Sequence, residues 1–521
     1  MSRVQQAARC VLRLQQVPVR ARSTAAVAQD AAAAEAVTSW DTARSYADIP
    51  GPKPLPVIGN AWRFMPVVGN LHGLGFDELV ETLHAEYGPV CKLSGMPRPD
   101  LLFVNDADTV QSVFRNEGTW PGRKGTHCIE HYFRDVRENY VPSLSVSHGK
   151  EWQEFRTAIN QVMMQPRNIV QYVEPIDNVA QDFIDRMRLI RTAAGKMPAN
   201  YTHELGKWAL ESISYVALDT RLGLLEKTLD PASDAAVMMT AISGVFDGIY
   251  DLDIKPSLWK WVATPAYKKF IGSMNVFTGL SSKYVEKAVT RLKTISKEDL
   301  EKSNRSVLEN LLLNTDDPDK AVSMAMDMLL AGVDTTSAVV STIMYQLATN
   351  PAKQAKLQEE LDRVLPDKNV TITKDQMEQL KYVRACVKET MRIMPIIPCN
   401  FRDVGKDQVI GGYQVPKGTI TVMANVLTHR AEKYFPQGSQ FLPERWLPGG
   451  GKSSHPFAFL PFGFGPRMCV GKRFANLELE SLIAKVFRNF TLEWNKPPAK
   501  TKFILMLHFE TPLEFTVKDR P

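Results

Sequence analysis

The sequence PFGFGPRMCVG, residues 461–471, places three glycines, two phenylalanines and an arginine around a single cysteine. Five residues form the pattern, namely Phe462, Gly465, Arg467, Cys469 and Gly471. At average residue usage, the probability of finding these residues at these spacings by chance is on the order of 10⁻⁴. Glycines allow a tight turn and the close approach of a bulky planar ligand, and backbone N–H groups directed at a sulfur stabilise a thiolate. The stretch therefore predicts a loop that holds an iron-binding thiolate.

A haem bound through such a thiolate also needs cations for its propionates. Arg467 lies two residues from Cys469. The sequence EWQEFR, residues 151–156, supplies Trp152 and Arg156 on one face of a predicted helix. Together these residues point to a haem-thiolate site.

Composition is that of a folded protein with a large buried core, since 44% of the 521 residues are hydrophobic and 23% are charged. Between about residue 50 and the end we find no Gly/Ser linker, low-complexity tract or repeat, which favours one large domain. The net charge of +6 arises partly at the N-terminus and is otherwise interspersed with acids. Nucleic-acid binding is therefore not expected.

The six cysteines are scattered without a CxxC motif: Cys10, Cys91, Cys128, Cys386, Cys399 and Cys469. This distribution argues against a disulfide scaffold or a structural zinc site and favours a reducing compartment. Any single cysteine is more often a small buried apolar residue than a reactive group.

The first 35 residues have the pattern of a mitochondrial targeting presequence. Five arginines precede the first acid, Asp30: Arg3, Arg9, Arg13, Arg20 and Arg22. A disordered basic tail is the alternative, but the segment also lacks the apolar core of a secretory signal. No run in this segment approaches the roughly 20 apolar residues that span a bilayer, so we expect no N-terminal membrane anchor. We also expect the presequence to be cleaved near residues 22 to 35.

Residues 36–60 form a proline-rich entry segment, which ends in DIPGPKPLPVIGN at 48–60. VCKLSG (90–95) and LLFVN (101–105) predict early strands, whereas most of 150–395 has helical spacing. The fold class is therefore mainly α with a smaller β region.

One long central helix is predicted in DDPDKAVSMAMDMLLAGVDTTSAVVSTIMYQLATNP, residues 316–351. Asp317 can cap it, Pro318 suits its first turn and Pro351 ends it. Although the segment is apolar around most of its circumference, Asp327 and Asp334 lie in its middle. A core helix is therefore a better interpretation than a membrane span.

The central sequence AGVDTT contains a glycine where alanine would favour the helix by about 1 kcal/mol. Gly332 could let the helix open locally. Alternatively, Thr335 bonds the carbonyl of Ala331, and Gly332 only lets another helix approach.

Two further motifs are weak evidence when taken alone. Glu389 and Arg392 are three residues apart in VKETMRIMP, on one face of a helix that ends before Pro395. FLPERWLP, residues 441–448, offers Arg445 in a proline-bounded loop. Such charged residues are usually solvated.

These motifs, in this order, resemble the cytochrome P450 family over essentially all of residues 48–521. The resemblance implies a single large haem-binding domain, with haem b (iron protoporphyrin IX) bound through the Cys469 thiolate. It implies that Trp152, Arg156, Arg402 and Arg467 meet the haem propionates. It implies a buried ion triad of Glu389, Arg392 and Arg445, and that Asp334 and Thr335 flank the oxygen site. One departure is Trp446, where the family usually has phenylalanine; we expect it to affect local packing only.

The resemblance also implies a monooxygenase that hydroxylates or epoxidises a small apolar substrate, such as a steroid, a terpenoid or a xenobiotic. The expected pocket segments are 126–146, 246–250, Met328 with Leu329, and Ile396 with Ile397. A non-redox isomerase or dehydratase of the family would typically lack the pair formed by Asp334 and Thr335. A haem-binding sensor or carrier would need neither this pair nor a docking surface.

Four cations resemble the docking positions of mitochondrial members: Arg384, Lys388, Lys472 and Arg473. Lone surface cations are usually only solvated, but as a patch they suit an acidic [2Fe–2S] ferredoxin of the adrenodoxin type, with its NADPH-dependent reductase. Overall the sequence is similar to arthropod mitochondrial members. PSLWKWVATPAYKKF, residues 256–270, mixes aromatics with lysines as interfacial segments do, which predicts peripheral contact with the matrix face of the inner membrane. Packing of this segment on the core is the alternative.

Overall fold

The computed structural model describes residues 39–94, 99–123, 125–137, 141–255, 257–294, 306–314, 318–451 and 455–521. The predicted presequence, and with it the expectation of no N-terminal anchor, lies outside the described residues. So does Asp317, the predicted helix cap.

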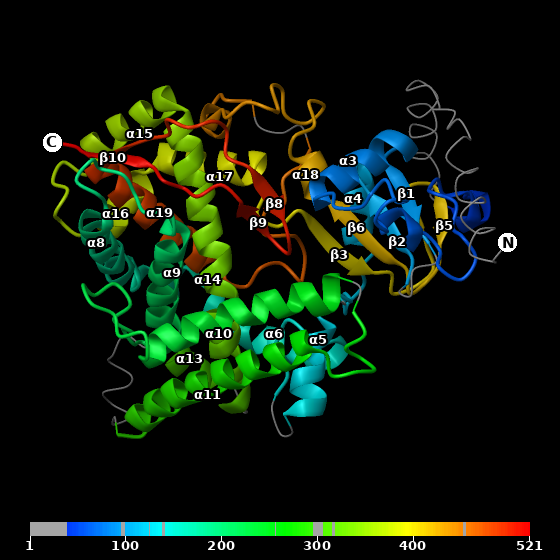
Figure 1. Ribbon diagram of the computed structural model, residues 1–521, viewed down its shortest axis with the longest axis horizontal. Helices are drawn as coiled ribbons and strands as arrows, with labels where there is room; N and C mark the ends of the chain where they lie inside the picture. The colour runs from blue at the N-terminus through cyan, green and yellow to red at the C-terminus, as the bar shows by residue number, and fades with distance from the viewer. Residues whose placement is uncertain are drawn as a thin grey trace. The chain divides into compact units, whose positions relative to one another are not determined.

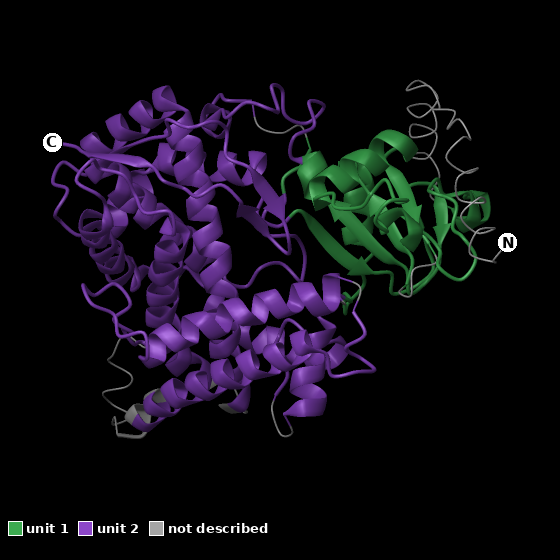
Figure 2. Ribbon diagram, viewed as in Figure 1, with its two compact units in different colours: residues 1–122, 398–428, 455–459 green, residues 123–397, 429–454, 460–521 purple. Residues whose placement is uncertain are grey.

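Two compact units make up the chain (Figure 2). Unit 1 comprises residues 1–122, 398–428 and 455–459, and unit 2 comprises residues 123–397, 429–454 and 460–521. The sequence predicted one large domain because it shows no linker. Each unit is assembled from three segments that are far apart in sequence. The chain therefore passes from one unit to the other several times, and none of these crossings is marked by a linker composition.

A four-stranded sheet forms the centre of unit 1, in the order β1 (Val90–Leu93), β2 (Leu101–Val104), β6 (Ile420–Ala424) and β3 (Cys399–Asp403). Strand β2 pairs antiparallel with β1 and parallel with β6, and β3 pairs antiparallel with β6. The bounds of β1 and β2 confirm the two strands predicted from VCKLSG and LLFVN. Their apolar residues, such as Leu102 and Val104, are buried in the core of this unit.

Short elements complete unit 1. Its helices are η1 (Trp40–Thr42), η2 (Tyr46–Asp48), η3 (Ala61–Phe64), α3 (Phe76–Tyr87), α4 (Ala107–Arg115) and α18 (Asn425–Thr428). A hairpin joins β4 (Gln408–Ile410) to β5 (Tyr413–Val415). Its two-residue turn, Gly411–Gly412, has φ values of +56° and +80°, which glycine adopts without strain.

Helices dominate unit 2 (Figure 1). Its first half contains α5 (His127–His131), η4 (Tyr132–Val136), α6 (Gly149–Met163), α7 (Pro166–Val170), α8 (Val173–Ile190), α9 (Tyr201–Leu218), α10 (Asp234–Ile249), η5 (Tyr250–Ile254) and α11 (Pro265–Thr294). Its second half contains α13 (Val307–Asn314), α14 (Pro318–Thr349), α15 (Pro351–Val364), α16 (Lys374–Gln379), α17 (Lys381–Ile393), η6 (Pro443–Trp446) and α19 (Lys472–Asn489). The helical content predicted for 150–395 is confirmed.

Two small antiparallel ribbons lie near the C-terminus of unit 2. β7 (Phe490–Glu493) pairs with β10 (Thr516–Asp519), and β8 (Thr501–Phe503) pairs with β9 (Leu507–Phe509).

The predicted long central helix is α14, which contacts α9, α11, α17 and α19 within unit 2. Its start at Pro318 and its end at Thr349 agree with the proline signals in the sequence. By length and composition alone, α14 and the segment Asp234–Ile254 could each cross a membrane. However, 61% and 56% of their apolar windows are buried in the protein, as expected for core helices.

Candidate active site

The loop around Cys469 is closed by backbone hydrogen bonds. The Cys469 N–H donates to the Phe462 carbonyl and the Met468 N–H to the Gly465 carbonyl, both at 3.0 Å. Gly463 and Gly465 have φ values of +71° and +72°, a region that side chains other than hydrogen disfavour. The loop conformation therefore requires glycine at position 465, and also at position 463, which the sequence pattern did not single out.

Cys469 differs from every other cysteine of the described chain. Its side chain is exposed, whereas those of Cys91, Cys128, Cys386 and Cys399 are buried. Burial raises the thiol pKa of all four buried cysteines well above its ordinary value. Among the described cysteines, only Cys469 thus combines a sulfur that a ligand can reach with a dedicated loop.

The surroundings of the Cys469 sulfur have two opposing effects on the pKa of its thiol. Although its side chain is accessible, desolvation by the nearby protein atoms raises the pKa of the Cys469 thiol. The Gly471 N–H, which donates to the sulfur, and the charges of Arg156, Arg123 and Lys472 lower the pKa again. Helix α19 begins at Lys472, so its positive N-terminal end also favours a thiolate.

Arg123 is a residue that the sequence analysis missed. Its charge acts on Cys469, Arg156 and Asp327, although it precedes them by at least 33 positions in the printed chain. No periodic pattern surrounds Arg123 that could have singled it out.

Three predicted haem-binding side chains gather close to the Cys469 loop. The Arg467 guanidinium lies 4.0 Å from the centroid of the Trp152 ring and donates to the Ser147 carbonyl at 2.9 Å. Arg156 lies one turn beyond Trp152 on α6 and acts electrostatically on the Cys469 sulfur. Its Nε is buried without a hydrogen-bond partner in the part of the chain that the structure describes. A buried guanidinium with a free donor fits the propionate of a haem.

Arg402 belongs to unit 1 and is described there. It is buried on β3, where its Nε donates to Glu117 and its guanidinium lies 4.7 Å from the centroid of the Phe114 ring. The sequence did not anticipate the pairing with Glu117, which lies 285 residues away. Contact of Arg402 with a propionate stays a prediction from the family motif.

The α14 sequence AGVDTT is continuous helix. Thr335 Oγ1 donates to the Ala331 carbonyl at 2.6 Å. A Cβ at Gly332 would lie 2.7 Å from Ile213 Cγ1, so glycine here allows close approach of α9. Both features match the alternative reading of AGVDTT as ordinary helix packing.

The carboxyl group of Asp334 has a pKa that suits proton transfer near neutral pH. Burial, followed by the negative charge of Asp247, raises the pKa of Asp334 to about 6. A carboxyl group with such a pKa exchanges protons readily near neutral pH.

Glu389, Arg392 and Arg445 form a fully connected, buried cluster. Arg392 donates to both Glu389 oxygens at 2.8 and 2.9 Å, and Arg445 Nε donates to Oε1 at 3.1 Å. The two guanidiniums also bind five backbone carbonyls, those of His429, Pro436, Gln437, Gly438 and Gln440. The cluster thereby ties α17 to the irregular segment 429–446.

Trp446 contributes more than the packing we expected from the sequence. Its Nε1–H donates to Glu389 Oε2 at 2.8 Å, and the Leu442 N–H donates to Oε1 at 2.9 Å. The departure from phenylalanine therefore adds a hydrogen bond to the buried carboxylate.

Parts of the predicted substrate region converge in unit 2. Residues of 127–133 and 245–252 share a buried apolar cluster with α11, against which Phe246, Leu330 and Leu505 pack while only partly buried. Met328 and Leu329 are buried, and Ile397 is exposed. The sequence missed Leu330 and Leu505, because neither stands out from its apolar neighbours.

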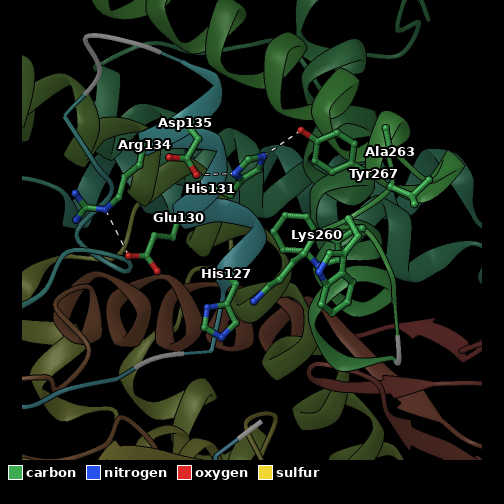
Figure 3. Close-up of a pocket in the computed structure, with 11 residues that line it drawn as sticks. His127, Glu130, His131, Arg134, Asp135, Lys260, Ala263 and Tyr267 are labelled. Atoms are coloured by element: carbon green, nitrogen blue, oxygen red, sulfur yellow. Dashed lines mark hydrogen bonds and ion pairs between the residues drawn. The ribbon is translucent and has the colours of Figure 1, made fainter. Parts of the chain in front are cut away.

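The predicted interfacial segment 256–270 is divided between core and surface. Trp259 and Phe270 are buried, which matches the packing alternative, whereas Leu258, Trp261 and Val262 are at least 60% exposed. Beside this segment lies a pocket of about 610 Å³ (Figure 3). In it His131 hydrogen-bonds both Asp135, at 2.7 Å, and the Tyr267 hydroxyl, at 3.1 Å.

The four predicted docking cations are partly engaged by the protein itself. Arg384 pairs with Glu480 at 2.9 Å, and Arg473 Nε donates to the Met164 carbonyl at 2.8 Å. Lys472 lies 5.7 Å from the Phe462 ring centroid. Lys388 is exposed, and its charge, like that of Arg384, lowers the pKa of Glu480 against the rise caused by burial.

The fold and the site define a mainly helical protein in which, among the described cysteines, one is accessible and lies in a glycine-rich loop close to buried cations. A model of the cytochrome P450 family matches residues 49–515, and the chain belongs to this family.

Curated relatives resemble the chain over nearly its whole length. "Probable cytochrome P450 49a1" of Drosophila melanogaster is 38% identical over 93% of this chain and 85% of its own length. "Probable cytochrome P450 301a1, mitochondrial" of Drosophila melanogaster is 37% identical over 92% of this chain and 88% of its own length. "Cytochrome P450 CYP12A2" of Musca domestica is 36% identical over 93% of both chains. The chain is accordingly a cytochrome P450 monooxygenase, whose cofactor is a haem with a cysteine thiolate ligand.

Proposed function

We propose that Cys469 is the thiolate ligand of the haem, and that the enzyme hydroxylates or epoxidises a small apolar substrate. The observation that carries the proposal is the accessible sulfur of Cys469, faced by the Gly471 N–H at the start of α19. Trp152, Arg156, Arg402 and Arg467 would bind the propionates, with Phe462, Gly465 and Gly471 shaping the loop. When bound, the haem supplies the activation of dioxygen, and electron donation from the thiolate favours cleavage of the O–O bond.

In this proposal Asp334 and Thr335 deliver protons to the oxygen site. The Asp334 carboxyl takes up a proton from solvent-side water and releases it toward the Thr335 hydroxyl. Thr335 then has to rotate away from the Ala331 carbonyl, which accepts its hydrogen bond in the resting helix. The partly buried surface of Phe246, Leu330 and Leu505 supports an apolar substrate such as a steroid, a terpenoid or a xenobiotic.

Replacing Thr335 with alanine is expected to uncouple electron use from product formation, because the variant lacks the hydroxyl that directs the proton. We expect product formed per NADPH to fall about tenfold or more, since positioned proton transfer contributes at least roughly 10²-fold to such steps. The measurement is the ratio of product to NADPH in a reconstituted assay, with a substrate selected by its effect on the haem spectrum. The matched variant Thr335→Ser keeps the hydroxyl and should keep the ratio. An unchanged ratio in Thr335→Ala would contradict the role of Thr335.

We further propose that an acidic [2Fe–2S] ferredoxin of the adrenodoxin type supplies the electrons, through its NADPH-dependent reductase. Several relatives carry the word "mitochondrial" in their names. This supports a mitochondrial location, which we place on the matrix side of the inner membrane. Arg384, Lys388, Lys472 and Arg473 would form the docking surface, and exposed Lys388 is the cation best able to meet an acidic partner.

Charge reversal at Lys388 (Lys388→Glu) is expected to weaken ferredoxin binding at low salt. The lost attraction and the new repulsion, each worth up to about 1 kcal/mol, should raise the apparent KM for ferredoxin about fivefold or more. High salt should shrink the difference. Lys287→Glu, on the exposed face of α11, is the matched control and should leave the KM unchanged. If both variants behave alike, the docking proposal is wrong.

Peripheral membrane contact is the third part of the proposal. Leu258, Trp261 and Val262 are exposed next to Lys255 and Lys260, a combination that suits the headgroup boundary of an anionic bilayer. Substrate could then enter from lipid near the pocket of Figure 3.

The double variant Trp261→Ser, Val262→Ser is expected to bind vesicles roughly tenfold or more weakly, because two apolar side chains no longer leave water. Full-length holoprotein should be sedimented with phosphatidylcholine vesicles that contain phosphatidylglycerol. Leu189→Ser, at a half-exposed apolar position on α8, serves as the control. Equal sedimentation of both variants and the unmodified protein would refute contact through this segment.

A further inference from the structure

Residues Pro142–Ser147, which we call the strap, lie between the central helix and the cysteine loop within unit 2. One end is held by Asp327 of α14. Its Oδ2 accepts the Leu144 N–H at 2.7 Å, and its Oδ1 accepts the Ser143 hydroxyl. Both Ser143 and Leu144 are buried, so these donors depend on Asp327 rather than on water.

The other end of the strap reaches the proposed haem site. The Ser147 carbonyl accepts a hydrogen bond from Arg467 at 2.9 Å. Helix α6 starts directly afterwards, at Gly149, and carries Trp152 and Arg156. Inside the strap, the N–H and the hydroxyl of Ser147 both donate to the Ser143 carbonyl at 3.0 Å. The strap is thus a short, internally bonded segment whose two ends contact Asp327 and Arg467.

Asp327 is a costly residue for its position. It interrupts an apolar helix, and burial raises its pKa to about 6 although Ser143, Leu144 and Arg123 counteract the shift. Each carboxyl oxygen accepts a hydrogen bond from the strap. These contacts favour a role in holding the strap over a role in binding a cationic substrate.

We propose that Asp327 is a positioning residue for the haem site. By fixing the strap to α14, it fixes the carbonyl that orients Arg467 and the start of the helix that carries Trp152 and Arg156. This inference rests on the proposed function, because it takes these residues to bind the propionates. It extends that function by linking the centre of α14 to the cysteine loop through one buried carboxylate.

Hydrogen exchange of the full-length holoprotein tests the first link. In Asp327→Ala, backbone amides of residues 143–147 should exchange at least tenfold faster than in the unmodified protein. Asp327→Asn removes the charge, yet its amide can still accept from Leu144 and donate to Ser143, so its exchange should stay slow. Ser143→Ala removes one of the two ties and should give an intermediate rate even if Asp327→Ala folds poorly. Ser341→Ala, a buried polar change elsewhere on α14, is the control.

The haem reduction potential tests the second link. Cations held near the haem stabilise its reduced form. Asp327→Ala and Asp327→Asn both remove the carboxylate charge, but only Asp327→Ala also frees the strap and with it Arg467. The reduction potential should therefore be lower in Asp327→Ala than in Asp327→Asn. In an Arg467→Gln background this difference should shrink, because the two residues act along one path. Unchanged exchange in Asp327→Ala, or an undiminished difference in that background, would overturn the proposal. Absence of a thiolate-ligated haem spectrum in the unmodified protein would instead refute the proposed function.

Discussion

Replacement of Glu389 by glutamine is expected to cost about 3–5 kcal/mol of folding free energy, a large share of the 5–15 kcal/mol typical of a folded domain. The Glu389 carboxylate is fully buried and accepts five hydrogen bonds, from Arg392, Arg445, Leu442 and Trp446. A neutral amide leaves two buried guanidiniums without their counter-charge. It also turns a donor group toward these donors, so the segment 429–446 loses its attachment to α17.

Thermal unfolding of the holoprotein, with haem content recorded in parallel, measures this cost. Two controls bracket the effect. Trp446→Phe removes one of the five donors and should cost about 1 kcal/mol. Glu493→Gln breaks an exposed ion pair with Lys518 and should cost at most about 1 kcal/mol. A Glu389→Gln protein as stable as Glu493→Gln would show that the buried cluster does not hold this part of the fold.

Local signals in the sequence predicted the central elements well. Pro318 and Pro351 delimit α14 because proline favours the first turn of a helix and ends the preceding one. The sequence also predicted that the glycines allow a tight turn in this loop. The backbone at Gly465 is left-handed, a conformation that glycine adopts without strain. In both cases the determining interaction lies within a few residues of the signal.

Long-range partners could not be predicted in this way. Asp327 accepts from residues 183 and 184 positions away, and Arg402 pairs with Glu117 at a separation of 285. Nothing near Arg384 indicated that Glu480 would engage it. The hydrogen bond of Trp446 to Glu389 could not be predicted either, because it depends on how η6 lies against α17. The division into two units, whose segments alternate along the sequence, likewise follows from tertiary contacts that leave no linker in the sequence.

Replacement of Cys469 by serine is expected to abolish the thiolate-ligated haem spectrum. Serine keeps the size and the loop geometry, but its hydroxyl does not become a comparable ligand at neutral pH. Cys399→Ala removes a cysteine that is buried on β3, so it should leave the haem ligand intact. The two variants therefore separate loss of the ligand from general loss of a cysteine.

The most direct measurement is the absorption spectrum of the reduced, carbon-monoxide-bound holoprotein, compared at equal haem content. We predict the band of thiolate-ligated haem in the unmodified protein and in Cys399→Ala, and its absence in Cys469→Ser. Persistence of the band in Cys469→Ser would contradict the assignment of Cys469 as the haem ligand and, with it, the proposed active site.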